Sequence, residues 1–357
     1  MELNQDIRYL NMVTESILDG LNRVIVGLQE ELKLLLTALL ADGHVLLEGV
    51  PGVAKTTIAR ALTRLLGLDK YNERGFSLNG VPFKGWSRIQ FTPDLMPSDI
   101  IGTLIFNPST RTFEPQFGPV FSYLVLADEI NRAIPRTQSA LLQAMQEREV
   151  VLGNHIYKLA DRNAGKFFFV IATQNPIEQE GTYPLPEAQL DRFLMRIIIS
   201  YPKTLEEEKA VLRLHLKRLE EPLEELSPVV EDPGFIVSAQ EWIAENVEIS
   251  DKALNYITYI VRNSRPEFNP EIGDTVLCGA SPRAGVALLR AAKAYAAING
   301  RTVADVYDVE KVAYPVLNHR LILNPERIVE ARLEEKTYLA AYRVAEEAIK
   351  NILDASR

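Results

Sequence analysis

The chain has almost no cysteine: Cys278 is the only one among 357 residues, so no disulfide can form within it. This fits a reducing compartment. Long apolar runs are also missing, since the most apolar stretches, 32–41 and 167–173, are too short to span a bilayer. The first residues lack the basic and then apolar pattern of a signal peptide. We therefore expect a cytoplasmic protein with no insertion into a membrane.

Positive charge is scarce as well. Lysine and arginine number 39 against 48 aspartates and glutamates, a formal net charge of −9. An acidic balance argues against nucleic acid as the main partner. The four histidines are widely separated along the chain and show no metal-ligand spacing. The remaining composition, 47% hydrophobic and 24% charged, is that of an ordinary globular protein long enough for two domains.

Two kinds of apolar pattern divide the chain near residue 202. Before it, short and nearly continuous apolar runs alternate with helical segments; the runs are 44–47, 88–91, 124–127, 167–173 and 195–199. Such runs indicate a parallel sheet buried on both faces. After it, the spacing of apolar residues is helical nearly throughout. We expect an α/β domain over residues 1–202 and a smaller all-helical domain over 203–357.

The loop after the first apolar run has the pattern of a phosphate-binding loop. Its residues are Gly49, Val50, Pro51, Gly52, Val53, Ala54, Lys55, Thr56 and Thr57. Backbone N–H groups of such a loop surround phosphates, Lys55 can reach the β- and γ-phosphates, and the Thr56 hydroxyl can bind Mg²⁺. The alternative is a glycine-rich turn with a surface lysine. Ala54 stands where glycine is usual, and because alanine is strained at positive φ, we predict a negative φ there.

Acidic and amide side chains follow two other apolar runs. Asp128 and Glu129 end one run, and Asn175 follows the next. Because the carboxyl ends of parallel strands meet at one edge of a sheet, these residues should lie near the phosphate loop. Asp128 would then hold Mg²⁺, Glu129 would orient and polarise the attacking water, and Asn175 would contact the γ-phosphate. Taken alone, Asn175 before Pro176 fits an ordinary turn better.

Several motifs together resemble the MoxR family of AAA+ ATPases. They are GVPGVAKT, VLADEINRA, ATQNP, LPEAQLDRF, the segment 88–99 and GASPRA at 279–284, in the family's order and spacing. Alanine before the lysine is itself usual in this family. The resemblance implies an AAA+ P-loop core with a five-stranded parallel sheet, an insert in the second helix at 91–102, a hairpin at 150–158 before the first sensor, and a helical lid.

The same resemblance implies roles for single residues. Asn175 would be the first sensor, and Arg192 the arginine finger that reaches a neighbouring subunit's site. Arg283 would be the second sensor and would touch the γ-phosphate of its own subunit. Arginine suits both roles because it is always charged and binds phosphate oxygens through two N–H groups. An ordinary surface pair with Asp191 is the alternative for Arg192.

By resemblance, the expected function is ATP hydrolysis in a ring, a hexamer in the typical case, that acts like a chaperone. It would remodel, activate or insert metal into client complexes, with a von Willebrand factor A domain protein as partner. Three alternatives stay open: an MCM-like nucleic-acid motor, a magnesium-chelatase-like ATPase subunit, and a nucleotide-gated scaffold without turnover. Glu129, Asn175 and Arg192 oppose the scaffold, because a pure binder needs none of them.

Overall fold

A parallel five-stranded sheet forms the centre of the α/β part. The computed structural model describes residues 7–73, 77–78, 80–176, 181–216, 222–335 and 339–357. In spatial order the strands are β11 (Met195–Ile199), β1 (Val45–Gly49), β10 (Phe169–Gln174), β7 (Ser122–Asp128) and β4 (Lys84–Gln90). Every residue of β1 and β7 is buried, which explains their nearly continuous apolar sequence. The predicted sheet is confirmed.

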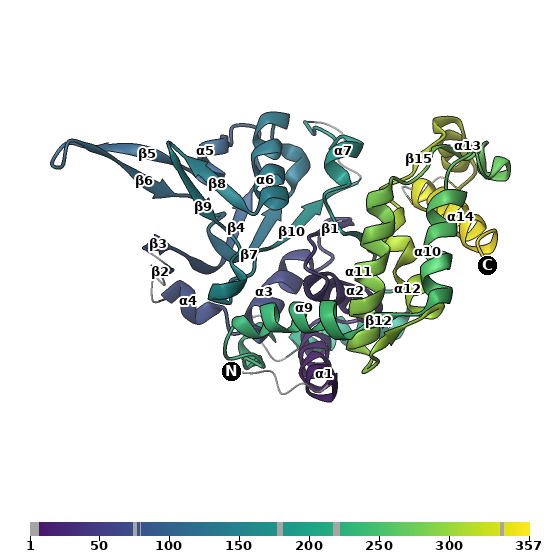
Figure 1. Cartoon of the computed structure of the whole chain (residues 1–357), viewed down its shortest axis with the longest axis horizontal. Helices are drawn as coiled ribbons and strands as arrows, with labels where there is room; N and C mark the ends of the chain where they lie inside the picture. Colours follow the sequence, from purple (N-terminus) through teal and green to yellow (C-terminus); the bar gives the residue numbers. More distant parts are fainter. Residues whose placement is uncertain (1–6, 74–76, 79, 177–180, 217–221, 336–338) are drawn as a thin grey trace.

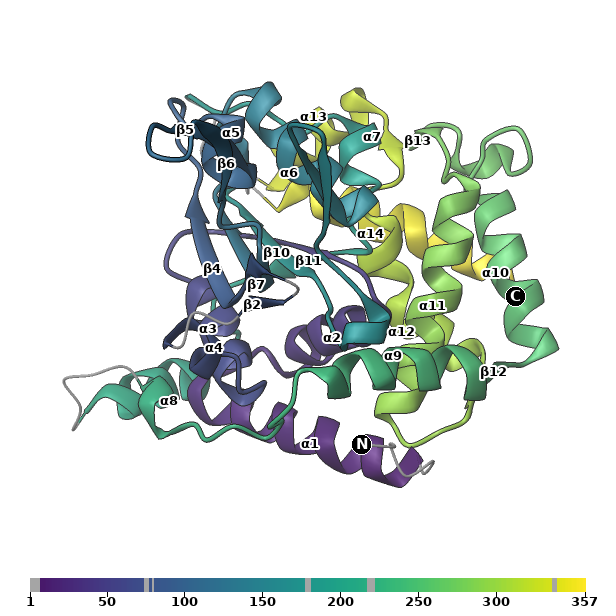
Figure 2. The ribbon, with the colours of Figure 1, turned by 60° about the vertical axis from the view of Figure 1, so that its left-hand side comes forward.

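Helices surround this sheet, and the first of them also packs against the C-terminal part of the chain. They are α1 (Ile7–Val24), α2 (Gln29–Leu40), α3 (Lys55–Leu65), α4 (Asp69–Glu73), α6 (Pro135–Glu147) and the short α7 (Glu187–Leu190). Helix α1 contacts α3 and also α11 (Pro282–Ile298), where Asn11 donates to the Ile298 carbonyl at 2.7 Å. Figure 2 shows α1 beside α9 (Gly234–Asn246), and their Tyr9 and Phe235 rings meet edge to face. The first helix therefore packs on residues of both predicted domains, and the boundary at 202 stays a prediction.

Two hairpins extend from the sheet. The expected one consists of β8 (Glu149–Leu152) and β9 (His155–Lys158), joined by the Gly153-Asn154 turn. The expected insert contains α5 (Pro97–Ile101) and continues into a second hairpin, β5 (Gly102–Asn107) with β6 (Thr112–Phe117), which the sequence analysis did not identify. Figure 1 shows this hairpin projecting away from the body. A further short pair joins β2 (Ser77–Leu78) to β3 (Val81–Pro82).

The C-terminal part is largely helical, as predicted, with two short strand pairs. After α8 (Leu205–His215) and α9 come α10 (Asp251–Asn263), α11, α12 (Val306–Leu317), α13 (Pro325–Glu335) and α14 (Ala340–Asp354). The strand pairs are β12 (Glu248–Ile249) with β14 (Val303–Ala304), and β13 (Val276–Cys278) with β15 (Ile322–Leu323). Side chains cap the helices: Thr204 and Glu207 form a capping box on α8, and Asp305 does so on α12 with Asp308. Among the described residues, no helix is long and apolar enough to cross a bilayer.

Candidate nucleotide site

The phosphate loop connects the end of β1 to the first residue of α3. Gly52 lies at φ 81° and Ala54 at φ 55° and ψ 14°, both in the left-handed region. The predicted negative φ of Ala54 is therefore wrong. Its carbonyl accepts the Ile58 N–H at 2.8 Å, which is the first hydrogen bond of α3. Left-handed residues in such loops turn successive N–H groups towards one point, which makes an anion-binding concavity.

Lys55 brings the loop to the carboxyl ends of two neighbouring strands. Its ammonium donates to the Gly49 carbonyl at 2.5 Å and to the Gln174 carbonyl at 3.3 Å. These carbonyls end β1 and β10, so the lysine charge lies at the sheet edge where ligands of open α/β sheets bind. Val50, in contrast, is fully buried and does not line the cavity described below.

The two acids at the end of β7 are tied together by a threonine. The Thr173 hydroxyl donates to Asp128 Oδ1 at 2.7 Å and accepts the Glu129 N–H at 2.9 Å. Glu129 itself has φ 56°, a second strained residue at the site. Sequence reasoning missed Thr173, although a hydroxyl at the end of a strand beside the acids was a visible signal.

Strand β4 supplies two further contacts that the sequence analysis did not foresee. Arg88 binds Asp128 Oδ2 through Nη2 at 2.5 Å and Nε at 3.2 Å. Gln90 donates to Glu129 Oε2 at 2.8 Å, and Arg132 lies 2.8 Å from the same oxygen. The register of β4 and β7 explains this, because Gln90 lies directly opposite Asp128. Both acids thus have cationic or amide partners in this structure.

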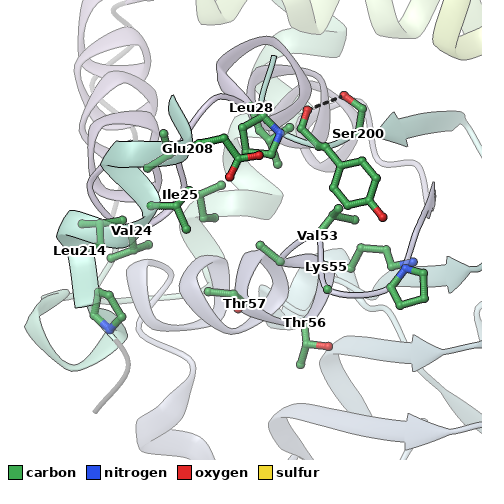
Figure 3. Close-up of a pocket in the computed structure, with 18 of the residues that line it drawn as sticks. Val24, Ile25, Leu28, Val53, Lys55, Thr56, Thr57, Ser200, Glu208 and Leu214 are labelled. Carbon is green, nitrogen blue, oxygen red and sulfur yellow. Dashed lines mark hydrogen bonds between the residues drawn. The ribbon is translucent and has the colours of Figure 1, made fainter. Parts of the chain in front are cut away.

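A cavity of 670 Å³ lies between the phosphate loop and the two acids, and its size suits a nucleotide. Its polar end is lined by residues 51–57 with Asp128, Glu129 and Asn175. Its other end is mostly apolar: it is lined by Val24, Ile25, Leu28, Val211 and Leu214, together with Glu208 and His215 of α8. Figure 3 shows Glu208 beside Ile25 and Leu28. The arrangement suits a ligand that is highly charged at one end and flat and apolar at the other.

Arg192 and Arg283 lie elsewhere. They line a separate cavity of 330 Å³, together with Asp191 and Arg320. Arg283 Nη1 is 3.9 Å from Asp191 Oδ2, and neither arginine lines the cavity of Lys55. Arg283 thus lies beside Asp191 in this structure, and its predicted contact with the γ-phosphate of its own subunit stays a prediction. The start of α11 packs instead beside the segment that carries Arg192.

Comparisons with known proteins agree with this geometry. Residues 44–195 match the ATPase family associated with various cellular activities (AAA), and residues 272–336 match an AAA lid domain. Chaperone MoxR1 of Mycobacterium tuberculosis is 39% identical over 86% of this chain and 75% of its own length. The chain belongs to the MoxR family of AAA+ ATPases. A second relative, protein YeaC of Bacillus subtilis, is 45% identical over 86% of both chains.

A comparison of three-dimensional structures shows similarity over nearly the whole of this MoxR-family chain. A crystal structure of a presumed ATPase from Cytophaga hutchinsonii superimposes with a TM-score of 0.77 at 38% identity, covering 96% of this chain and 95% of the other. The matched lid model includes both Arg283 and Arg320. The residues near Lys55 also fit a hard cation, because the Thr56 hydroxyl and the Asp128 carboxylate line one cavity and offer the oxygen ligands that Mg²⁺ prefers.

Proposed function

We propose that this chain hydrolyses ATP in a ring of identical subunits and uses the cycle as a chaperone. The main observation behind the proposal is that the predicted site residues line two separate cavities. Lys55, Thr56, Asp128, Glu129 and Asn175 share one cavity. The arginines that would complete the charge balance line the other. A complete site then needs the second cavity of a neighbouring subunit.

Within one subunit, each residue has a distinct task. The loop N–H groups and Lys55 bind the phosphates of ATP, and Thr56 with Asp128 holds Mg²⁺, which supplies positive charge to the phosphate oxygens. Glu129 accepts a hydrogen bond from the attacking water and orients it, and Asn175 binds the γ-phosphate. Arg88 and Arg132 form ion pairs with Asp128 and Glu129, and these pairs hold the two carboxylates in place.

Across the subunit boundary, we assign Arg192 as the arginine finger and place Arg283 beside it. An arginine supplied by a neighbour contributes on the order of 10³–10⁵ in rate. Arg283 and Arg192 belong to one surface in this structure, since both line the cavity that contains Asp191. We propose that Arg283 contacts the nucleotide of the neighbouring subunit, as an alternative to the contact with its own nucleotide that the family resemblance implies.

The chaperone role rests on the relatives and on two exposed hairpins. One relative is named a chaperone. The β5–β6 hairpin exposes Phe106 and Phe113, and the β8–β9 hairpin exposes Val151 and Ile156. Exposed apolar side chains on projecting strands are suited to contact partner proteins. We propose a von Willebrand factor A domain protein as that partner, remodelling or metal insertion as the outcome, and the cytoplasm as the location, in line with the family resemblance.

The proposed activity is tested by measuring phosphate release and ATP affinity in three variants. Lys55→Ala should lose ATP binding, because it removes the ammonium that lies at the carbonyls ending β1 and β10. Glu129→Gln should bind ATP with unchanged affinity and release no phosphate. Lys350→Ala, an exposed lysine on α14, is the matched control and should behave as the parent protein. Normal ATP affinity in Lys55→Ala would overturn the assignment of the phosphate loop.

A further inference from the structure

Arg320 lies between α12 and β15, and its side chain is only 4% exposed. Its guanidinium is directed at the segment 191–194. Nε donates to Asp191 Oδ1 at 2.7 Å, Nη2 to the Phe193 carbonyl at 2.6 Å and the Asp191 carbonyl at 3.3 Å, and Nη1 to the Leu194 carbonyl at 3.1 Å. A fourth carbonyl, that of Val316, accepts from Nη1 as well. All but one of these acceptors belong to the residues on either side of Arg192.

The two residues before Arg320 support the same segment. A ring nitrogen of the buried His319 lies 3.1 Å from the Phe193 carbonyl. Asn318 donates to the Arg196 carbonyl at 3.0 Å and accepts from Arg196 Nε at 3.0 Å. The residues that follow α12 therefore hydrogen-bond to backbone carbonyls from Asp191 to the start of β11. These bonds fix the backbone from which the Arg192 side chain extends.

Asp191 connects this support to the lid. One of its oxygens binds Arg320, and the other lies 3.9 Å from Arg283 at the start of α11. Arg283 is 61% exposed, whereas Arg320 is buried. The Asp191 carboxylate therefore lies between the buried side chain of Arg320 and the exposed side chain of Arg283, and the half-buried Arg192 follows Asp191 in the chain.

We propose that Arg320 is a positioning residue that fixes the 191–194 segment and, through Asp191, presents Arg192 and Arg283 together to the neighbouring subunit. This inference rests on the proposed function, since it deepens the role of the second cavity. Arg320 and Arg283 both belong to the matched lid, so the lid contacts the segment that carries Arg192 at two points. Lysine cannot replace Arg320, since a single ammonium cannot reach a carboxylate and several carbonyls in the fixed fork of a guanidinium.

The test is a double-mutant cycle on kcat for ATP hydrolysis by the full-length protein, with Arg320→Lys and Arg192→Ala. Misplacement of a catalytic group by about 1 Å costs on the order of 10²-fold in rate, so Arg320→Lys should lower kcat by about that factor. KM and ATP affinity should stay within about twofold, because the residues that bind ATP in the same subunit are untouched. In the Arg192→Ala background, Arg320→Lys should lower kcat no further. Mixing Arg320→Lys subunits with Glu129→Gln subunits should restore part of the ATPase activity.

Arg301→Lys is the matched control. Arg301 is partly exposed and forms an ion pair with the buried Asp308 of α12. It makes no contact with residues 191–194 among those described, so kcat should be unchanged. If Arg320→Lys does not fold, Asp191→Asn, which removes the shared charge, replaces it in the cycle. Unchanged kcat in Arg320→Lys, or an equal loss with and without Arg192, overturns the inference. Unchanged kcat in Arg192→Ala alone overturns the proposed function instead.

Discussion

The left-handed conformation of Ala54 gives a measurable prediction about stability. An L-residue in this region costs about 1–2 kcal/mol, and glycine does not incur this cost. Glycine also gives the unfolded chain more freedom, which lowers stability by about 0.4–1 kcal/mol. For Ala54→Gly the two effects oppose each other, so we expect a net gain in the free energy of unfolding of up to about 1.6 kcal/mol.

A control alanine at negative φ isolates the strain. Ala355, exposed after α14 at φ −70°, has no strain to release, so Ala355→Gly should lose about 0.4–1 kcal/mol. The difference between the two variants is then the backbone strain itself, about 1–2 kcal/mol. Urea unfolding of the nucleotide-free protein measures it well, because in a chain of 357 residues 1 kcal/mol shifts Tm by only about 1–2 °C. Equal destabilisation of both variants would show that residue 54 has negative φ in solution.

Three further predictions concern protonation, metal and nucleotide. Burial lowers the pKa of His44 to about 3, with Arg148 adding to the effect, so the unfolded chain binds this proton more readily than the folded one. The free energy of unfolding should therefore fall as pH drops from about 6.5 towards 3, by ~1.4 kcal/mol per pH unit from this residue, and His44→Gln should show a correspondingly smaller slope in urea unfolding. Thr56→Ala should need more Mg²⁺ for half-maximal phosphate release, whereas Thr56→Ser should not; equal requirements would exclude the hydroxyl as a ligand. Glu129→Gln loaded with ATP should capture a protein partner in a pull-down followed by mass spectrometry, and recovery of DNA instead would favour an MCM-like motor.

The sequence predicted those features that depend on neighbours along the chain. The apolar runs identified all five strands of the sheet, and the polar residues at their ends included Asp128, Glu129 and Asn175, which line the Lys55 cavity. The apolar residues of that cavity, from the α1–α2 connection and α8, were not predicted. The conformation of Ala54 could not be inferred in this way. Its local preference is for negative φ, and the loop and the first turn of α3 override that preference together.

Long-range packing accounts for the other differences. The position of Arg283 depends on how α11 meets Asp191, which is far away in the sequence. Asp191 in turn is bound by Arg320, more than a hundred residues further along the chain. The β5–β6 hairpin was missed because its strands are mostly exposed and show little apolar alternation. The residues of its turn, Asn107-Pro108-Ser109, were a signal that could have revealed it.

The central claim, a site shared between subunits, is tested most directly by mixing two inactive variants. Arg192→Ala subunits retain Lys55 and Glu129, and Glu129→Gln subunits retain Arg192. When the two are combined, some boundaries contain both intact halves. We predict that each variant alone releases almost no phosphate and that mixtures recover part of the parent activity, with a maximum near equal proportions. Mixtures that stay inactive at every ratio, although the subunits assemble together, would contradict a site built from two chains.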